Sequence, residues 1–188
     1  LRAAQFRSRF GFQVAPSTIS ICRALDLREL SAERVEMEMK KALLESRLPS
    51  EFFECLREMD QLGYWFQELE QLIGLEQNLK FHPEGDVWTH TMMVLDRSAH
   101  FRSCVSDPYA FMLLALTHDF GKITATEFVN GAIHAYGHEL QGVEIAERFL
   151  DRVCQGSDIK RYIGNMLPNH MRPNKIAEAR SAVKKTNR

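Results

Sequence analysis

The sequence lacks any apolar run approaching the ~18 consecutive residues of a membrane-spanning helix, and it contains no internal repeat or low-complexity tract. It also lacks a Cys-x-x-Cys pair, because its cysteines stand far apart, at Cys22, Cys55, Cys104 and Cys154. These absences argue against a membrane protein, a cysteine-ligated zinc site and a disulfide framework. We therefore expect reduced, mostly buried thiols in a cytoplasmic protein.

A strong net charge is absent as well. The 24 basic and 25 acidic residues leave a net charge of −1, which argues against a globally basic nucleic-acid binder. The two ends are locally basic, through Arg2, Arg7, Arg9, Lys175, Arg180, Lys184, Lys185 and Arg188. Such clusters can contact phosphates, but solvated helix faces are the more common outcome.

Helical periodicity is present along nearly the whole sequence. Val35, Met39 and Leu43 recur at four-residue steps after Ser31, a suitable N-cap. A second helix is expected to open at Pro49-Ser50 and to end at Gly63, and a short third helix to end at Gly74. Further helices are expected at about 87–101, 109–118, 138–153, 158–166 and 174–186.

One stretch, residues 127–135, is a weak strand candidate because Asn130-Gly131 between apolar residues suits a hairpin turn. The flanking apolar sequence is short, so we expect a loop there and an all-α chain. A polar stretch at residues 74–86 interrupts the helices. No histidine precedes this stretch, and all seven lie within it or after it.

The histidines predict a metal site. His118-Asp119 ends an apolar run long enough for a buried helix, while His90 lies in a helix, His138 opens one and His170 follows Pro168-Asn169. Facing helices can bring such side chains to one centre. Imidazoles and a carboxylate suit divalent transition metals, and Asp119 would be the bridge between two ions. Lys122 and Arg172 follow as cations able to hold phosphate oxygens.

Each of these residues also has a structural interpretation. His90 alone fits a hydrogen-bonded core histidine, and His118-Asp119 fits an imidazolium paired with a carboxylate at a helix end. We expect His82 and His134 at the surface, in loops. His100 lies about 280° around the helix from His90 at 100° per residue, so it need not face the same centre.

His90, His118-Asp119, Gly121-Lys122, His138 and His170 together resemble the HD superfamily of metal-dependent phosphohydrolases. The stretch His82-Pro-Glu-Gly-Asp-Val-Trp-Thr-His90 is similar to the HD domain of bacterial CCA-adding tRNA nucleotidyltransferases. Residues 1–12 resemble the neck motif of class II enzymes of that family, and Ser31-Ala-Glu-Arg34 resembles the next neck helix.

The resemblance implies an all-α fold, with a helical neck region at residues 1–75 and an HD-domain bundle at 76–188. It implies a divalent ion, with Mg, Mn, Ni, Fe, Co and Zn not distinguished, and a phosphatase or 2′,3′-cyclic phosphodiesterase activity. The expected metal ligands are His90, His118, Asp119, His138 and His170, and the expected catalytic residues are Asp119 and Lys122. tRNA, nucleotides and a phosphoester substrate are the expected partners.

The sequence departs from the family pattern at both ends. The nucleotidyl-transfer head is absent, so we expect no CCA addition by this chain alone. The HD pattern also has a terminal Asp, and no Asp follows His170 in this sequence. Either this Asp lies beyond residue 188, as we expect, or the last ligand of the family is lacking. Two other functions remain open: a free-standing HD nucleotide phosphohydrolase, which the neck motif argues against, and a non-catalytic helical module that binds RNA.

Overall fold

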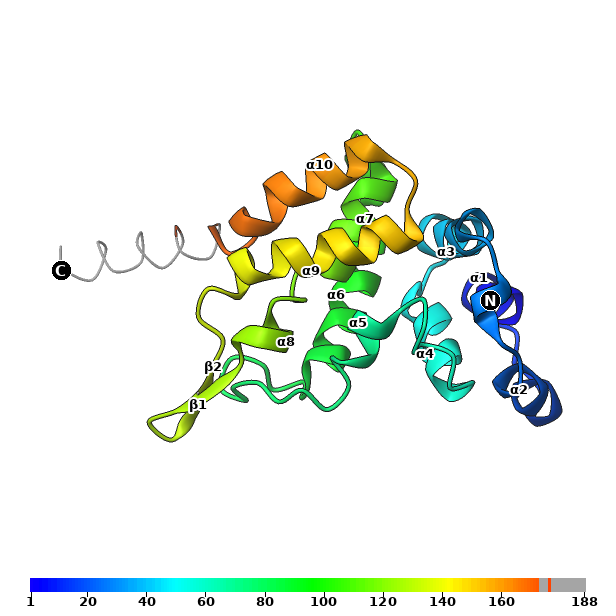
Figure 1. Cartoon of the computed structure of the whole chain (residues 1–188), viewed down its shortest axis with the longest axis horizontal. Helices are drawn as coiled ribbons and strands as arrows, with labels where there is room; N and C mark the ends of the chain where they lie inside the picture. Colours follow the sequence, from blue (N-terminus) through cyan, green and yellow to red (C-terminus); the bar gives the residue numbers. More distant parts are fainter. Residues whose placement is uncertain (173–175, 177–188) are drawn as a thin grey trace.

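Helices form nearly all the regular structure of this computed structural model, which describes residues 1–172 and residue 176 (Figure 1). The predominantly helical fold class predicted from the sequence is confirmed. The helices are α1 (Arg2–Phe10), α2 (Pro16–Arg23), η1 (Leu27–Glu29), α3 (Ala32–Glu45), α4 (Ser50–Glu58), α5 (Gln67–Glu70), α6 (Val87–Ala99), η2 (Arg102–Cys104), α7 (Pro108–Thr117), α8 (Lys122–Ala125), α9 (His138–Val153), α10 (Ser157–Met166) and η3 (Leu167–Asn169).

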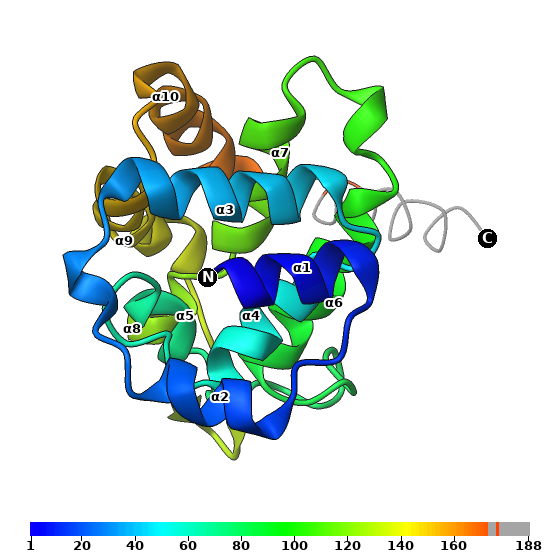
Figure 2. The ribbon, with the colours of Figure 1, turned by 90° about the vertical axis from the view of Figure 1, so that its right-hand side faces the viewer.

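The helices fall into two groups (Figure 1). The N-terminal group consists of α1–α4 and the central group of α5–α10. α6 and α7 pack against each other through the middle of the molecule, and α9 contacts α3, α8 and α10. At the other end, α1 packs on α3 and α4, and Figure 2 shows α1 and α3 side by side. Because the helices from α6 onward meet in the middle, their ends can carry side chains to one place.

Aromatic rings join the two groups. Phe53 and Phe66 stand edge to face at 5.7 Å between ring centroids, and Phe66 reaches Phe149 of α9 at 6.4 Å. Phe149 in turn stacks edge-on against Phe120 at 5.3 Å. Such pairs each contribute about 0.5–1.5 kcal/mol beyond the burial of their area. The division into residues 1–75 and 76–188 stays a prediction.

Most helix ends follow the sequence pattern, with two exceptions. The short helix expected to end at Gly74 is α5, and it ends at Glu70. α9 has the predicted bounds, and α3 follows Ser31 as expected. α4 was expected to end at Gly63, and this was wrong. It ends at Glu58, because Asp60 takes the left-handed conformation (φ 56°) and the Gln61 N–H bonds back to the Leu56 carbonyl at 2.9 Å. The helix predicted at 174–186 lies outside the described residues except for Ile176.

The loop expected at residues 127–135 is a β-hairpin, so that prediction was wrong. β1 (Glu127–Val129) pairs antiparallel with β2 (Ala132–His134), with Phe128 opposite Ile133. Both turn residues have positive φ, 52° at Asn130 and 81° at Gly131, which is the geometry of a type I′ turn. The turn chemistry therefore outweighs the shortness of the strands.

Two of the three arginines near the start of the chain are paired with carboxylates, whereas Arg2 is exposed and lies over the Phe6 ring. Arg7 bonds Glu51 at 2.6 Å and Glu58 at 2.7 Å, and Arg9 forms an ion pair with Glu45. They therefore form part of helix packing and do not constitute a free phosphate-binding cluster. The basic residues from Lys175 onward lie outside the described residues.

The cysteines were expected to be reduced and mostly buried, and two of the four are buried. All four cysteines are free; Cys55 and Cys154 are buried, Cys22 is half-buried and Cys104 is exposed. Within residues 1–172 and residue 176, no helix is both long and apolar enough to cross a membrane.

Candidate metal centre

Asp119 is the centre of the site and stands at the end of the most apolar helix. Asp107 caps α7, accepting the Ala110 N–H at 3.0 Å, and Pro108 occupies its first turn. Buried residues from Tyr109 to Thr117 fix this helix in the core. Its end therefore holds Asp119 at a set position, with only 3% of the residue exposed.

One carboxylate oxygen of Asp119, Oδ2, faces two imidazoles and an ammonium group. His118 Nε2 lies 3.2 Å away and His90 Nε2, from the first turn of α6, lies 3.6 Å away. Lys122 Nζ lies 2.8 Å from the same oxygen. The buried ammonium also donates to Gln77 Oε1 at 2.9 Å, which satisfies a second of its protons.

The other oxygen, Oδ1, faces the two remaining histidines. His138 Nε2 from the start of α9 lies 3.3 Å from it, and His170 Nε2 lies 3.8 Å from it. These two ring nitrogens are 3.2 Å apart. Each oxygen of Asp119 thus has its own pair of imidazoles.

A close backbone approach brings α9 to Asp119. Gly121 packs so tightly on the start of α9 that an added Cβ would lie 1.8 Å from the His138 carbonyl oxygen. Gly142, one helical turn further along α9, faces the Gly121 backbone in return, with 3.0 Å between its Cβ position and the Gly121 nitrogen. Only glycine permits this contact, and the contact sets His138 beside Asp119.

Three of the four imidazoles are oriented by their own backbone. The Nδ1 atoms of His118, His138 and His170 lie 2.8, 2.7 and 2.7 Å from a carbonyl oxygen three residues earlier. A carbonyl oxygen only accepts hydrogen bonds, so each Nδ1 carries the proton. In the neutral ring, Nε2 then presents its lone pair to Asp119, as a metal ligand does.

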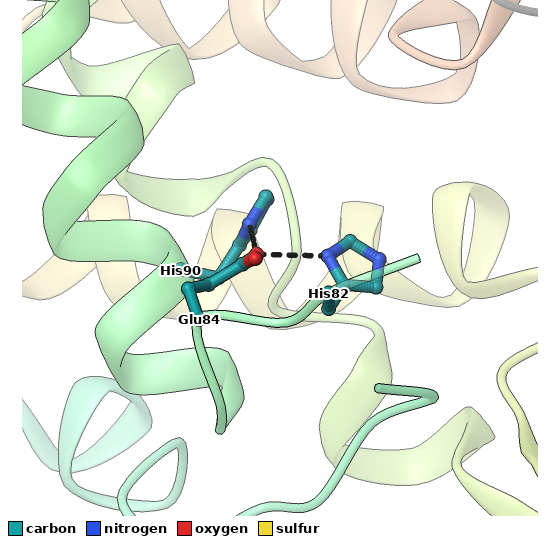
Figure 3. A group of neighbouring side chains, drawn as sticks. All are labelled: His82, Glu84 and His90. Atoms are coloured by element: carbon teal, nitrogen blue, oxygen red, sulfur yellow. Dashed lines mark hydrogen bonds and ion pairs between the residues drawn. The ribbon is translucent and has the colours of Figure 1, made fainter. Parts of the chain in front are cut away.

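The fourth imidazole is oriented by a carboxylate. His90 Nδ1 donates to Glu84 Oε1 at 2.6 Å, and His82 Nδ1 donates to the same oxygen at 3.0 Å. Figure 3 shows the Glu84 carboxylate between the two rings. Burial would raise the pKa of the Glu84 carboxyl, but hydrogen bonds from its own N–H and from both histidines lower it to about 2.

Burial and charge set the protonation of the centre. Burial would raise the pKa of the Asp119 carboxyl, but the neighbouring His118 and Lys122 help to hold that pKa well below its usual range. Burial lowers the pKa of His90 and of His170, which keeps both rings neutral at neutral pH. Burial would lower the pKa of His118 too, but the Asp119 charge and the hydrogen bonds to Asp119 and to the Ala115 carbonyl together raise that pKa.

The donor set fits divalent ions on both sides of Asp119. Bonds of about 2.0–2.2 Å place neighbouring ligand atoms roughly 3.0–3.6 Å apart at octahedral to tetrahedral angles. Four of the five separations lie in this range: 3.2 and 3.3 Å around Oδ1, and 3.2 and 3.6 Å to Oδ2. The fifth, 3.8 Å between His170 Nε2 and Oδ1, is slightly longer. Lone pairs of two neutral rings that face each other at 3.2 Å repel unless a proton or a cation lies between them.

The five residues predicted as ligands thus converge, and Lys122 joins them, whereas Arg172 is exposed. His100 does not face the centre; it is exposed and bonds the Asp96 carbonyl at 3.0 Å. His134 stacks on Tyr136, with centroids 4.9 Å apart. His82 was expected at the surface, but it lies against His90, with 27% of its side chain exposed.

Sequence reasoning missed Glu84 and Gln77. Pro83 and Glu84 are the central residues of a turn closed by the Gly85 N–H on the His82 carbonyl at 3.2 Å. Proline favours the second position of such a turn, so His-Pro-Glu-Gly was a readable signal for it. Gln77 lies 45 residues before its partner Lys122, and no local pattern indicates that contact.

Several curated proteins related to this chain are named multifunctional CCA protein. A multifunctional CCA protein of Actinobacillus pleuropneumoniae serotype 5b is 34% identical over 188 residues, which cover 96% of this chain and 45% of that protein. The one from Dechloromonas aromatica is 37% identical over 88% of the chain and 42% of its own length. The one from Nitrosococcus oceani is 39% identical over 81% of the chain and 37% of its own length.

Over this shared part, the chain belongs to the multifunctional CCA protein family. The family resemblance inferred from the sequence is confirmed. No family model matches the chain. The chain spans less than half the length of these multifunctional CCA proteins, 37–45%.

Proposed function

We propose that the centre around Asp119 is a metal-dependent phosphohydrolase site that cleaves phosphomonoesters or 2′,3′-cyclic phosphates. The observation that carries this proposal is the division of Asp119, with Oδ2 facing His90 and His118 and Oδ1 facing His138 and His170. A carboxylate with one imidazole pair on each oxygen suits two neighbouring divalent ions, an arrangement found in phosphoesterases.

The residues of the chain have distinct roles in this proposal. The four imidazoles and Asp119 would hold the ions, which supply Lewis acidity and a hydroxide at neutral pH. The backbone carbonyls on Nδ1 keep three rings from turning away. Lys122 is the cation closest to Asp119 and would stabilise negative charge on phosphate oxygens.

The proposal extends to the context of the chain. The relatives are named multifunctional CCA proteins, and the neck motif at residues 1–12 resembles that of CCA-adding enzymes. We infer that the site serves a protein that acts on tRNA and nucleotides. The alternative of an RNA-binding module without catalysis has less support, since Arg7 and Arg9 at the basic start are paired with carboxylates.

Metal analysis together with hydrolysis of p-nitrophenyl phosphate and 2′,3′-cAMP tests this function. Each assay is run with Mg, Mn, Ni, Co and Zn, and with Fe under anaerobic conditions. The wild-type chain should bind metal and turn over at least one substrate. His118→Ala and Asp119→Ala should abolish both properties, because each removes a proposed ligand.

His100→Ala is the matched control, since it deletes an exposed imidazole at the C-cap of α6, outside the centre. It should leave metal content and turnover unchanged. Absence of bound metal, or turnover that survives Asp119→Ala, would overturn the phosphohydrolase proposal. A salt titration of tRNA binding would then test the RNA-binding module, because phosphate contacts weaken steeply as salt rises.

A further inference from the structure

Resting on the proposed function, we propose that Glu84 is a positioning residue of the site. It holds the His90 ring by Nδ1 so that Nε2 faces Asp119, and His82 holds Glu84 in place. The loop formed by residues 76–86 would thereby support only the Oδ2 side of the centre. Glu84 itself would touch neither ion nor substrate.

The distances distinguish positioning from coordination. His82, Glu84 and His90 also form a cluster whose ligand atoms lie within 4.8 Å of one another, as the ligands of an ion do. However, Glu84 Oε1 lies 2.6 Å from His90 Nδ1, which is a charge-assisted hydrogen-bond distance. Two ligands of one ion stand roughly 3.0–3.6 Å apart. The proton therefore lies between these two atoms, and the free nitrogen of His90 is Nε2.

The 76–86 loop is fixed well enough to hold a ring. Asp86 caps α6 through the Thr89 N–H at 2.9 Å, and its second oxygen accepts the Gly74 N–H at 2.7 Å. The Val87 N–H bonds the Leu75 carbonyl at 3.0 Å, so the two ends of the loop are tied together. A carboxylate carried on such a closed loop can hold its partner within a few tenths of an ångström.

The turn His82-Pro83-Glu84-Gly85 positions both the His82 imidazole and the Glu84 carboxylate. Its closing hydrogen bond, Gly85 N–H to the His82 carbonyl at 3.2 Å, puts the His82 and Glu84 side chains two residues apart on one short turn. Glu84 accepts from both rings while only 16% of its side chain is exposed (Figure 3). His82 thus fixes the carboxylate that fixes His90.

The loop supports one side of the centre and not the other. Gln77 on the same loop accepts from Lys122 Nζ at 2.9 Å, and Lys122 contacts Oδ2 of Asp119. On the Oδ1 side, His138 and His170 are oriented by carbonyls of their own segments. A change at Glu84 should therefore weaken one ion and spare the other.

Glu84→Gln is the decisive variant, because the amide keeps the shape but can turn its NH₂ group toward Nδ1. That turn favours the tautomer with the proton on Nε2, which cannot bind metal. Loss of an outer partner typically costs about 10–100-fold in metal affinity. Calorimetric titration with Zn²⁺ or Mn²⁺ should show one ion weakened by this factor and the other unchanged.

Nitrogen NMR of the His90 ring in the metal-free chain gives an independent readout. At about pH 8, where an ordinary imidazole is neutral, wild type should show the proton on Nδ1. Glu84→Gln should show a mixture or the opposite tautomer. Glu84→Asp keeps the charge but is one methylene shorter, so it should lose the contact too. His82→Ala should have a smaller effect, about 2–5-fold on metal affinity, since the hydrogen bond between Glu84 and His90 remains.

Glu76→Gln is the matched control, as it removes the same charge from an exposed position in the same loop. It should leave both readouts at wild-type values. An unchanged His90 tautomer in Glu84→Gln, or equal weakening of both ions, would overturn the inference while the proposed function stands. If wild type binds no ion, the proposed function fails, and the tautomer of His90 still decides the role of Glu84.

Discussion

The two sides of Asp119 carry the same ligand types and yet are held in different ways. On the Oδ1 side, His138 and His170 each bond a carbonyl three residues earlier, so short local segments orient both rings. On the Oδ2 side, the Ala115 carbonyl orients His118 in the same way, but His90 depends on Glu84, and the ammonium of Lys122 shares the oxygen. One side is thus built locally, and the other depends in part on contacts that a loop provides.

This difference implies that the two sides should respond unequally to change. Local backbone contacts persist as long as their helix ends persist, whereas a side-chain partner on a loop can be removed by one substitution. The cation at Oδ2 also opposes an ion there, and no such group contacts Oδ1 among residues 1–172 and 176. We therefore expect the Oδ1 side to retain its ion more firmly.

Removal of Asp119 should have the largest effect, because it serves both sides. Asp119→Ala should weaken both ions by more than about 100-fold, since even loss of an outer partner costs about 10–100-fold. It also leaves the buried Lys122 ammonium unpaired, which should lower the free energy of unfolding by about 3–5 kcal/mol. Denaturant titration and metal calorimetry measure these two effects.

The double variant Asp119→Ala/Lys122→Met separates the effects. It should recover much of the lost stability, because no buried charge remains unpaired, but it should not recover metal binding. Recovery of metal binding would show that Asp119 is not a ligand.

Gly121→Ala should disrupt the Oδ1 side by moving α9. The new Cβ would lie 1.8 Å from the His138 carbonyl oxygen, a backbone atom that cannot move without its helix. We expect a loss of about 3 kcal/mol or more in stability, at the upper end of overpacking costs. Gly142→Ala is the comparison. Its new Cβ would lie 3.0 Å from the Gly121 nitrogen and 3.1 Å from the Leu167 side chain, so it should lower the free energy of unfolding by roughly 1 kcal/mol.

Substitution of a single histidine should remove the ion on one side of Asp119 and leave the ion on the other side. His138→Ala should remove one ion and leave the other near its wild-type affinity, and His90→Ala should do the converse. The stoichiometry from metal analysis should fall from two ions to one in each case. Loss of both ions in either variant would mean that the sides are not independent.

Among the variants at the centre itself, Lys122→Met should have the smallest effect on binding, and that effect should have the opposite sign. Removal of the ammonium 2.8 Å from Oδ2 should strengthen the ion on that side by roughly 10-fold, since like charges at short range repel. Turnover should nevertheless fall, because the cation for phosphate oxygens is lost. Calorimetry and p-nitrophenyl phosphate hydrolysis on the same samples distinguish the two roles.

The sequence by itself determined the helices and the chemistry of the ligands. The helical spacing of apolar residues and the capping residues predicted α3 and α9, because the interactions that start and stop a helix act within a few residues. His118-Asp119 at the end of an apolar run indicated where a buried helix would deliver its polar end. The hairpin was misjudged, although the signal of Asn130-Gly131 was local and present.

Only the tertiary structure decided how the ligands divide and what supports them. The assignment of one imidazole pair to each oxygen of Asp119 depends on the side-chain direction at four separate helix ends, and spacing along a chain does not encode it. Lys122 meets Gln77 across 45 residues. Such contacts arise from packing at long range, where the Gly121 approach and the closed 76–86 loop set positions that no local pattern specifies.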